Sequence, residues 1–151
     1  KDGTWIKGIW EDGIWENGYW YDGMWKDGVW KYGTWKNGIW RNGIWKNGIW
    51  NKGSWSDGTW EDGIWENGYW YDGMWKSGIW ENGKWIKGIW KNGTWGNGIW
   101  TDGKWKNGVW KHGVWKHGTW ENGFWKEGYI YDPKLKDYVY STVNPKEYFN
   151  K

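Results

Sequence analysis

Two histidines, His112 and His117, come closest to a chemical site in both residue type and spacing. They are five residues apart, and each stands directly before a Gly, where Asn or Asp stands at most equivalent positions. Neutral imidazoles at neighbouring turns can share a metal ion, or can respond together to pH near about 6.5. The simpler interpretation is a pair of exposed turn residues, and we predict no metal site and no cofactor.

Acidic residues are common but form no catalytic arrangement. Asp before Gly is typical of a residue that caps its own turn through its side chain, and a calcium ladder is the alternative. Glu recurs on what we interpret as a solvated strand face opposite Lys of neighbouring rows. No nucleophile stands with a base, and the Gly spacing is not that of a phosphate-binding loop. We therefore predict no catalytic residues and no enzyme activity.

Paired tyrosines are the best candidates for a binding surface. Tyr19 and Tyr21 flank Trp20, and Tyr69 and Tyr71 flank Trp70. Tyrosines that point outward from a strand can stack on sugar rings, so these four are candidate glycan contacts. Packing between neighbouring strands explains the same residues.

The elements that position these residues are five-residue repeats. From residue 1 to residue 130 the chain reads as 26 consecutive pentads, with Gly at position three of every one and Trp at position five of the first 25. Position two is Asn or Asp in 18 pentads, position one is charged in 18, and position four is Ile, Val or Thr in 17. Glu61 to Trp75 repeats Glu11 to Trp25 residue for residue, ten pentads later.

The segment after the array has a different pattern. Two short aromatic runs, Tyr129 to Tyr131 and Tyr138 to Tyr140, bracket a Pro-containing turn and predict a hairpin. Asn144 and Pro145 predict the cap and first position of a short helix. We interpret residues 131–151 as a C-terminal cap on the array of residues 1–130, because the end units of repeat arrays differ from the rest.

Each pentad predicts a very short strand followed by a turn. Asn-Gly and Asp-Gly are strong turn signals because both residues tolerate positive φ, and we expect this φ at every position-three Gly. Side chains alternate across a strand, so Trp points one way while positions four and one point the other. The sequence thus predicts a structural core of Trp residues, represented by Trp25, Trp45, Trp65 and Trp85. The turn glycines are represented by Gly23, Gly43, Gly63 and Gly83.

Two all-β architectures fit this pattern. In an antiparallel meander, hairpins resembling tryptophan zippers would follow one another, as Trp80 to Trp85 suggests. A two-residue loop, however, needs positions four and one to send their amides to opposite neighbours, although they are two residues apart. A β-solenoid with inward Trp ladders avoids this conflict, because parallel coils stack at about 4.8 Å with the turn as corner. We predict the solenoid and keep the meander as the alternative.

The array resembles the pentapeptide-repeat family of β-solenoids, on the strength of Trp at position five and Gly at position three across residues 1–130. That resemblance implies right-handed, four-sided coils of four pentads. This chain departs from the family in using Trp for Leu or Phe, Gly for Ala, and Ile or Thr directly before the large residue. Under four-pentad coils, one face would carry the apolar residues Ile9, Val29, Ile49, Tyr69, Ile89, Val109 and Tyr129.

Composition and charge narrow the function. The chain has 25 Trp, 27 Gly, 10 Tyr and no Cys, and its net charge of +3 is scattered. A scattered charge does not predict a nucleic-acid partner, and a Gly every five residues leaves no membrane span. Residue 1 falls in repeat phase without an initiating Met, so we expect the segment to begin inside a longer chain.

Gly-x-Trp pentads resemble low-complexity arrays in structural proteins of bacterial viruses. We predict a structural module of a fibre, filament or virion, extracellular or virion-borne, that associates with itself or with other structural proteins. The alternative is a glycan-binding module of the cell surface.

Overall fold

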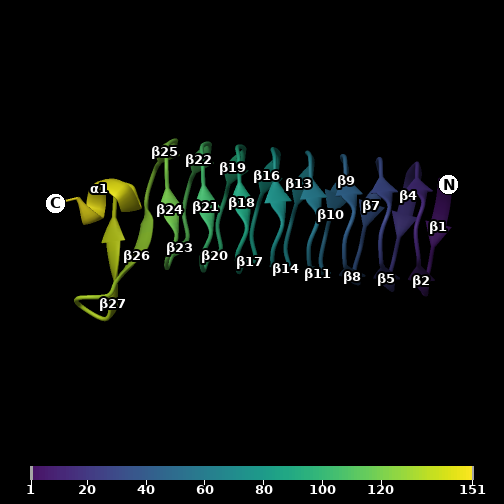
Figure 1. Ribbon diagram of the computed structural model, residues 1–151, viewed down its shortest axis with the longest axis horizontal. Coiled ribbons are helices and arrows are strands. Elements are labelled where there is room, and N and C mark those ends of the chain that lie inside the picture. The colour runs from purple at the N-terminus through teal and green to yellow at the C-terminus, as the bar shows by residue number, and fades with distance from the viewer. Residues whose placement is uncertain (1, 151) are drawn as a thin grey trace.

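Three β-sheets wrap around one axis in the computed structural model, which describes residues 2–150 (Figure 1). All their strands pair in parallel except the last one, at the C-terminal end. Strands fifteen residues apart pair in parallel, as Ile49 does with Ile64 and Trp50 with Trp65. Each coil therefore takes three pentads, and the chain is an all-β solenoid. The antiparallel meander is wrong. Lys1 and Lys151, the outer ends of the predicted array and cap, lie outside the described residues.

Each sheet forms one face of the rod, and the strands of one face come from every third pentad. The first face contains β1 (Asp2–Trp5), β4 (Asn17–Trp20), β7 (Thr34–Trp35), β10 (Ile49–Trp50), β13 (Ile64–Trp65), β16 (Ile79–Trp80), β19 (Thr94–Trp95), β22 (Val109–Trp110) and β25 (Phe124–Trp125). The second face contains β2 (Ile9–Trp10), β5 (Met24–Trp25), β8 (Ile39–Trp40), β11 (Ser54–Trp55), β14 (Tyr69–Trp70), β17 (Lys84–Trp85), β20 (Ile99–Trp100), β23 (Val114–Trp115), β26 (Gly128–Asp132) and β27 (Asp137–Ser141). The third face contains β3 (Ile14–Trp15), β6 (Val29–Trp30), β9 (Ile44–Trp45), β12 (Thr59–Trp60), β15 (Met74–Trp75), β18 (Ile89–Trp90), β21 (Lys104–Trp105) and β24 (Thr119–Trp120).

Two backbone hydrogen bonds per pentad tie each coil to the one before it. The position-four N–H donates to the preceding coil's Gly carbonyl, as Ile64 does to Gly48 at 2.9 Å. The position-one N–H donates to the Trp carbonyl, as Glu66 does to Trp50 at 2.8 Å. The ladder thus continues past the two-residue strands into position one, and bends occupy only positions two and three.

The corners are built on glycine in a conformation that other residues rarely adopt. Position-three Gly has φ between 109° and 134° in 25 pentads, from Gly3 to Gly123. Many corners are also capped by their own position-two side chain, as when Gly63 N–H donates to Asp62 Oδ1 at 2.8 Å. Gly128, at the start of β26, is the exception to the predicted positive φ.

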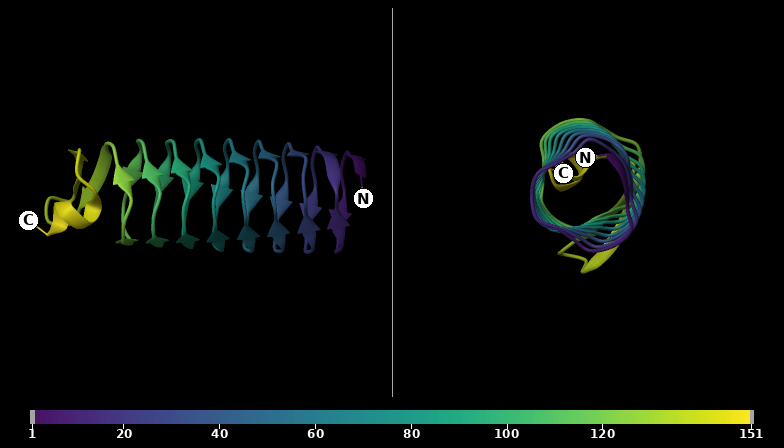
Figure 2. Two further views of the ribbon diagram at one scale, coloured as in Figure 1. Left: turned by 90° about the horizontal axis from the view of Figure 1, so that it is seen from above. Right: turned by 90° about the vertical axis from the view of Figure 1, so that its right-hand side faces the viewer.

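The four-sided coil implied by the pentapeptide-repeat resemblance is wrong, because the coil has three sides. The end-on view in Figure 2 shows the coils following one another around a common axis. Buried Trp side chains fill the interior. The apolar stripe expected for four-pentad coils is wrong for the same reason. Its members lie twenty residues apart and so fall on all three faces in turn; Ile49, for example, is on the first face and Ile89 on the third.

Tryptophan fills the interior as three columns of stacked rings. Indoles fifteen residues apart are parallel, as Trp65 and Trp80 are, with centroids 4.9 Å apart and planes at 5°. Indoles five residues apart meet edge to face, as Trp65 and Trp70 do at 5.9 Å and 72°. The predicted core residues Trp25, Trp45, Trp65 and Trp85 are fully buried. Trp5 and Trp10, in the first coil, are only partly buried.

A hairpin and a short helix follow the last pentad. Ile130 replaces the final Trp and is fully buried, and β26 and β27 pair in antiparallel with Ile130 opposite Val139. Helix α1 (Pro145–Phe149) is capped at its N-terminus by Asn144, whose Oδ1 accepts a hydrogen bond from Glu147 N–H at 3.0 Å. Figure 2 shows the helix across the C-terminal end of the stack. Pro145 is buried, and Tyr148 packs against the core.

Candidate binding groove on the second face

A groove runs along the second face, parallel to the axis of the rod. Its larger section has a volume of about 540 Å³ and extends from Asn37 to Ile99. A second section of about 530 Å³ extends from Lys7 to Ser54. The two sections share Asn37, Gly53 and Ser54, so the groove is continuous over seven successive coils.

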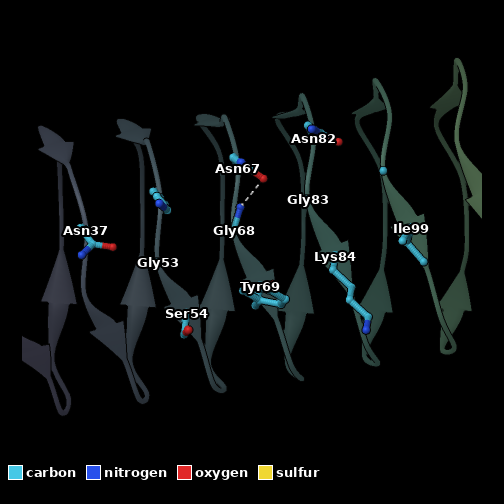
Figure 3. Close-up of a pocket in the computed structure, with 12 residues that line it drawn as sticks. Asn37, Gly53, Ser54, Asn67, Gly68, Tyr69, Asn82, Gly83, Lys84 and Ile99 are labelled. Carbon is cyan, nitrogen blue, oxygen red and sulfur yellow. Dashed lines mark hydrogen bonds between the residues drawn. The ribbon is translucent and has the colours of Figure 1, made fainter.

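The pentad itself produces this groove. Position two and position four both carry outward side chains, whereas Gly at position three between them carries none. Stacked coils therefore place a row of position-two side chains along one wall, a row of position-four side chains along the other, and Gly backbone on the floor. Figure 3 shows this arrangement, with Asn67 and Asn82 on one wall and Tyr69 and Lys84 on the other.

The larger section combines amides, ammonium groups and one aromatic ring. Lys52 and Lys84 are its only charged lining residues, and they stand on opposite walls two coils apart. The amide of Asn67 is held in place, because its Oδ1 accepts the Gly68 N–H at 2.8 Å. Glu66 and Glu81 stand at position one before the same corner but do not line the groove. Ile99 also lines this section, so its lining mixes polar and apolar groups, and its only charged groups are positive.

The predicted glycan contacts lie on the surface but do not form one site. Tyr19, Tyr21, Tyr69 and Tyr71 are each about half exposed. Tyr69 and Tyr71 lie together, with ring centroids 6.4 Å apart and planes at 24°. Tyr19 belongs to β4 on the first face and Tyr69 to β14 on the second, so the two pairs are separated. Only Tyr69 lines the groove's larger section.

The two histidines sit at successive corners, and each contacts a different tyrosine of the next coil. The His112 ring meets Tyr129 edge to face at 6.3 Å, and the His117 ring meets Tyr131 at 5.6 Å. His112 Nδ1 is also 3.7 Å from a carboxylate oxygen of Glu127. Within residues 2–150 no group of three or more His, Asp or Glu side chains is placed to hold a metal ion.

Charged position-one residues pair along the axis, as the sequence predicted. Glu61 bonds Lys76 of the next coil at 3.3 Å, and Glu11 bonds Lys26 at 2.9 Å. Glu121 instead bonds Lys104 on the preceding coil at 2.7 Å, and this bond lowers the pKa of the Glu121 carboxyl. These exposed pairs contribute little to stability.

The groove was not predicted from the sequence. The sequence nevertheless contains the pattern that produces it. Gly at position three has no side chain and lies between two outward side chains, so a groove forms wherever coils stack in register. The lining, however, depends on which pentads share a face. With coils of four pentads, Lys52 and Lys84 would have been placed on different faces.

Together, fold and groove define a tryptophan-cored β-solenoid repeat protein. No family model and no curated protein matches the sequence. Among solved structures, it is similar to the polySia-specific acetyltransferase NeuO, with 6% identity, a TM-score of 0.22, and coverage of 95% of this chain and 82% of that one. It is also similar to a putative acetyltransferase from Desulfovibrio desulfuricans G20, with 4% identity, a TM-score of 0.18, and coverage of 96% of this chain and 35% of that one. A similarity this low gives no basis for inferring a function. Among the described residues, no helix has the length and apolar character needed to cross a membrane.

Proposed function

We propose that the chain is a non-enzymatic structural module of a fibre, filament or virion, extracellular or virion-borne, and that it associates through its first face. The observation that carries the proposal is the outward column of that face. Its nine position-four residues are all uncharged, whereas the second face includes Lys84 and the third Lys104. The nine are Thr4, Tyr19, Thr34, Ile49, Ile64, Ile79, Thr94, Val109 and Phe124.

This first-face column suits lateral contact between rods. Ile49, Ile79 and Phe124 are 36%, 45% and 62% exposed, which leaves apolar surface in water. Side chains one coil apart on a parallel sheet form a continuous strip along the rod, and a large exposed apolar strip usually marks an interface. The continuous indole interior supports the same proposal, because a rod packed solidly along its length resists bending.

The test compares two pairs of substitutions that change charge equally. Ile49→Lys with Ile79→Lys places two charges on the first face, and Ile44→Lys with Ile89→Lys places two on the third face. We expect sedimentation velocity to show assemblies for the unmodified chain and for the third-face pair, and folded monomers for the first-face pair. Electron microscopy should show lateral association in the same two samples. A monomeric unmodified chain at all concentrations, or release by both pairs alike, would contradict the proposal.

A further inference from the structure

We infer that the second-face groove between Lys52 and Lys84 binds an extended acidic polysaccharide. The site goes beyond the proposed assembly role, because it lies on a different face and uses different residues. Three properties of the groove carry the inference: its charge, its stacking surface and its length.

The charge of the groove selects an anion. Lys52 and Lys84 face the larger section from opposite walls, and no acidic residue lines it. Carboxylates of a chain lying between the walls would meet an ammonium group on either side, and charge-assisted hydrogen bonds of this kind are roughly twice as strong as neutral ones. The side-chain amides of Asn67 and Asn82 would form hydrogen bonds with the hydroxyl groups of the sugar, because an amide both donates and accepts hydrogen bonds.

The aromatic ring in the groove favours a sugar over other anions. Tyr69 is 51% exposed, and Tyr71 packs beside it, so the ring is supported on one side and open to a ligand. The C–H face of a pyranose can lie flat on such a ring. An acidic peptide would find only one aliphatic side chain to contact in this section, that of Ile99. Nucleic-acid affinity depends on many phosphate contacts, whereas this section offers two cations.

The shape of the groove favours a long ligand. Successive coils here repeat at the 4.8 Å spacing of the stacked indoles Trp55, Trp70 and Trp85, which is comparable to the length of one pyranose in an extended chain. Each added sugar therefore reaches one further coil and its Asn or Lys side chain. Affinity is expected to increase with chain length until the oligosaccharide spans the section from Asn37 to Ile99.

The experiment measures binding of oligogalacturonates of increasing length by titration calorimetry. The unmodified chain should bind them with affinity that rises with length, and should not bind neutral cello-oligosaccharides of equal length. Lys52→Gln with Lys84→Gln removes both ammonium groups and should weaken binding by about tenfold or more. A tenfold loss of affinity corresponds to about 1.4 kcal/mol of binding free energy. Tyr69→Ser should weaken it without changing the net charge.

The matched control removes two lysines from another face. Lys91→Gln with Lys106→Gln lowers the net charge equally, and binding should be unchanged. An equal loss of oligogalacturonate affinity in both double variants would overturn the inference. So would equally tight binding of polyglutamate or oligo-dT, because either result would mean that the chain attracts any polyanion. Failure of the unmodified chain to bind oligogalacturonates would overturn it too. Unchanged near-UV circular dichroism shows that each variant remains folded.

Discussion

Glycine at position three meets two separate constraints at every inner corner. Its φ near +120° is strained for any residue with a Cβ. Its backbone also lies against the Gly of the preceding coil, so that a Cβ added at Gly63 would come within 3.0 Å of Gly48 backbone atoms. In the first coil only the φ constraint applies, because the described residues include no coil before it. Gly13 has a φ of +120°, but a Cβ added there would meet only the Trp10 ring, at an ordinary contact distance of 3.5 Å.

Substitution of these glycines should therefore give two levels of destabilisation. Gly13→Ala carries backbone strain alone and should lower the free energy of unfolding by about 1–2 kcal/mol. Gly63→Ala adds a backbone clash that forces adjacent coils apart and should cost about 3 kcal/mol or more. Denaturant unfolding followed by Trp fluorescence measures both. Equal losses for the two variants would show that coil contact contributes nothing to the requirement for Gly.

Tryptophan at position five carries most of the burial within a pentad. Burying an indole removes about 150 to 250 Å² from water, worth about 4 to 6 kcal/mol, against an ordering cost of about 7 to 8 kcal/mol for five residues. Ladder hydrogen bonds and ring stacking supply the difference.

Truncation of one central indole should be severe compared with truncation of its outward neighbour. Trp65→Ala removes a fully buried ring stacked on both sides, and we expect a loss of about 3 to 5 kcal/mol. Ile64→Ala on the same strand removes a half-buried side chain and should cost about 1 kcal/mol. Thermal unfolding of the two variants makes the comparison, and similar melting temperatures would contradict the indole-core interpretation.

At the scale of elements, the strands of the array are too short to be stable alone, whereas the cap has a hairpin and a helix that contact each other. Two-residue strands gain stability solely from the coils above and below, so the array behaves as a one-dimensional stack of coupled units. The cap is tied together by Asp132, whose carboxylate accepts hydrogen bonds from Lys134 N–H at 2.8 Å and from Tyr148 O–H at 2.9 Å.

The cap should lose stability at both acid and alkaline pH. The Lys134 N–H and then the Tyr148 hydroxyl lower the pKa of Asp132, so its contribution is present above the unfolded pKa of about 3.9 and is lost as pH falls through the lower folded value. The same bond to Asp132 raises the pKa of Tyr148, so that contribution is present below the unfolded pKa of about 10 and is lost as pH rises through the folded value.

Asp132→Asn should therefore flatten the pH dependence of cap stability in both ranges. Hydrogen exchange of β27 amides between pH 3 and 7, corrected for intrinsic rates, measures the acid side. Asp57→Asn is the control, because it places Asn at a corner position where Asn is already frequent. An unchanged pH profile in the Asp132 variant would show that the hydrogen bonds of Asp132 do not hold the cap.

At the scale of the whole molecule, the sequence predicted the architecture but not the number of sides. Alternation along each pentad is a local property, so inward Trp, outward position four and the Gly corner could all be read from one repeat. The number of sides depends instead on the angle turned at each corner and on how many indoles fill a cross-section, which are properties of a packed coil. Three indoles meeting edge to face close the coil at fifteen residues, whereas the family that the array resembles packs smaller residues.

All three faces contribute the same inward residue, Trp. The interior therefore repeats every pentad, whereas the outward side chains align only between residues one coil apart. The repeated segment illustrates this: Ile14 lies on the third face, and its counterpart fifty residues later, Ile64, lies on the first. The copy is shifted by one face, yet Trp15 and Trp65 are both buried.

Deletion of one pentad and deletion of one coil should therefore both leave a folded rod. Removing Lys91–Trp95 shifts every later pentad by one face and breaks the outer columns, whereas removing Lys91–Trp105 restores their alignment. We expect both variants to unfold cooperatively, with melting temperatures within a few degrees of each other. The coil deletion removes Gly98 and Ile99 from the end of the groove, but Gly113 and Val114 of the next second-face strand take their places, so oligogalacturonate binding should persist. Collapse of the single-pentad variant would mean that outward columns, rather than the indoles, set the register.

The parallel indole columns also make the protein an unusual optical object. Rings such as Trp65 and Trp80, 4.9 Å apart with nearly parallel planes, have transition dipoles that couple strongly. The ring planes of neighbouring columns are turned by 75° relative to these. Excitation absorbed by one ring will migrate along a column and across to the next before emission. The folded rod should thus show intense exciton bands in circular dichroism and strongly depolarised fluorescence, and both signals should vanish when the coils separate.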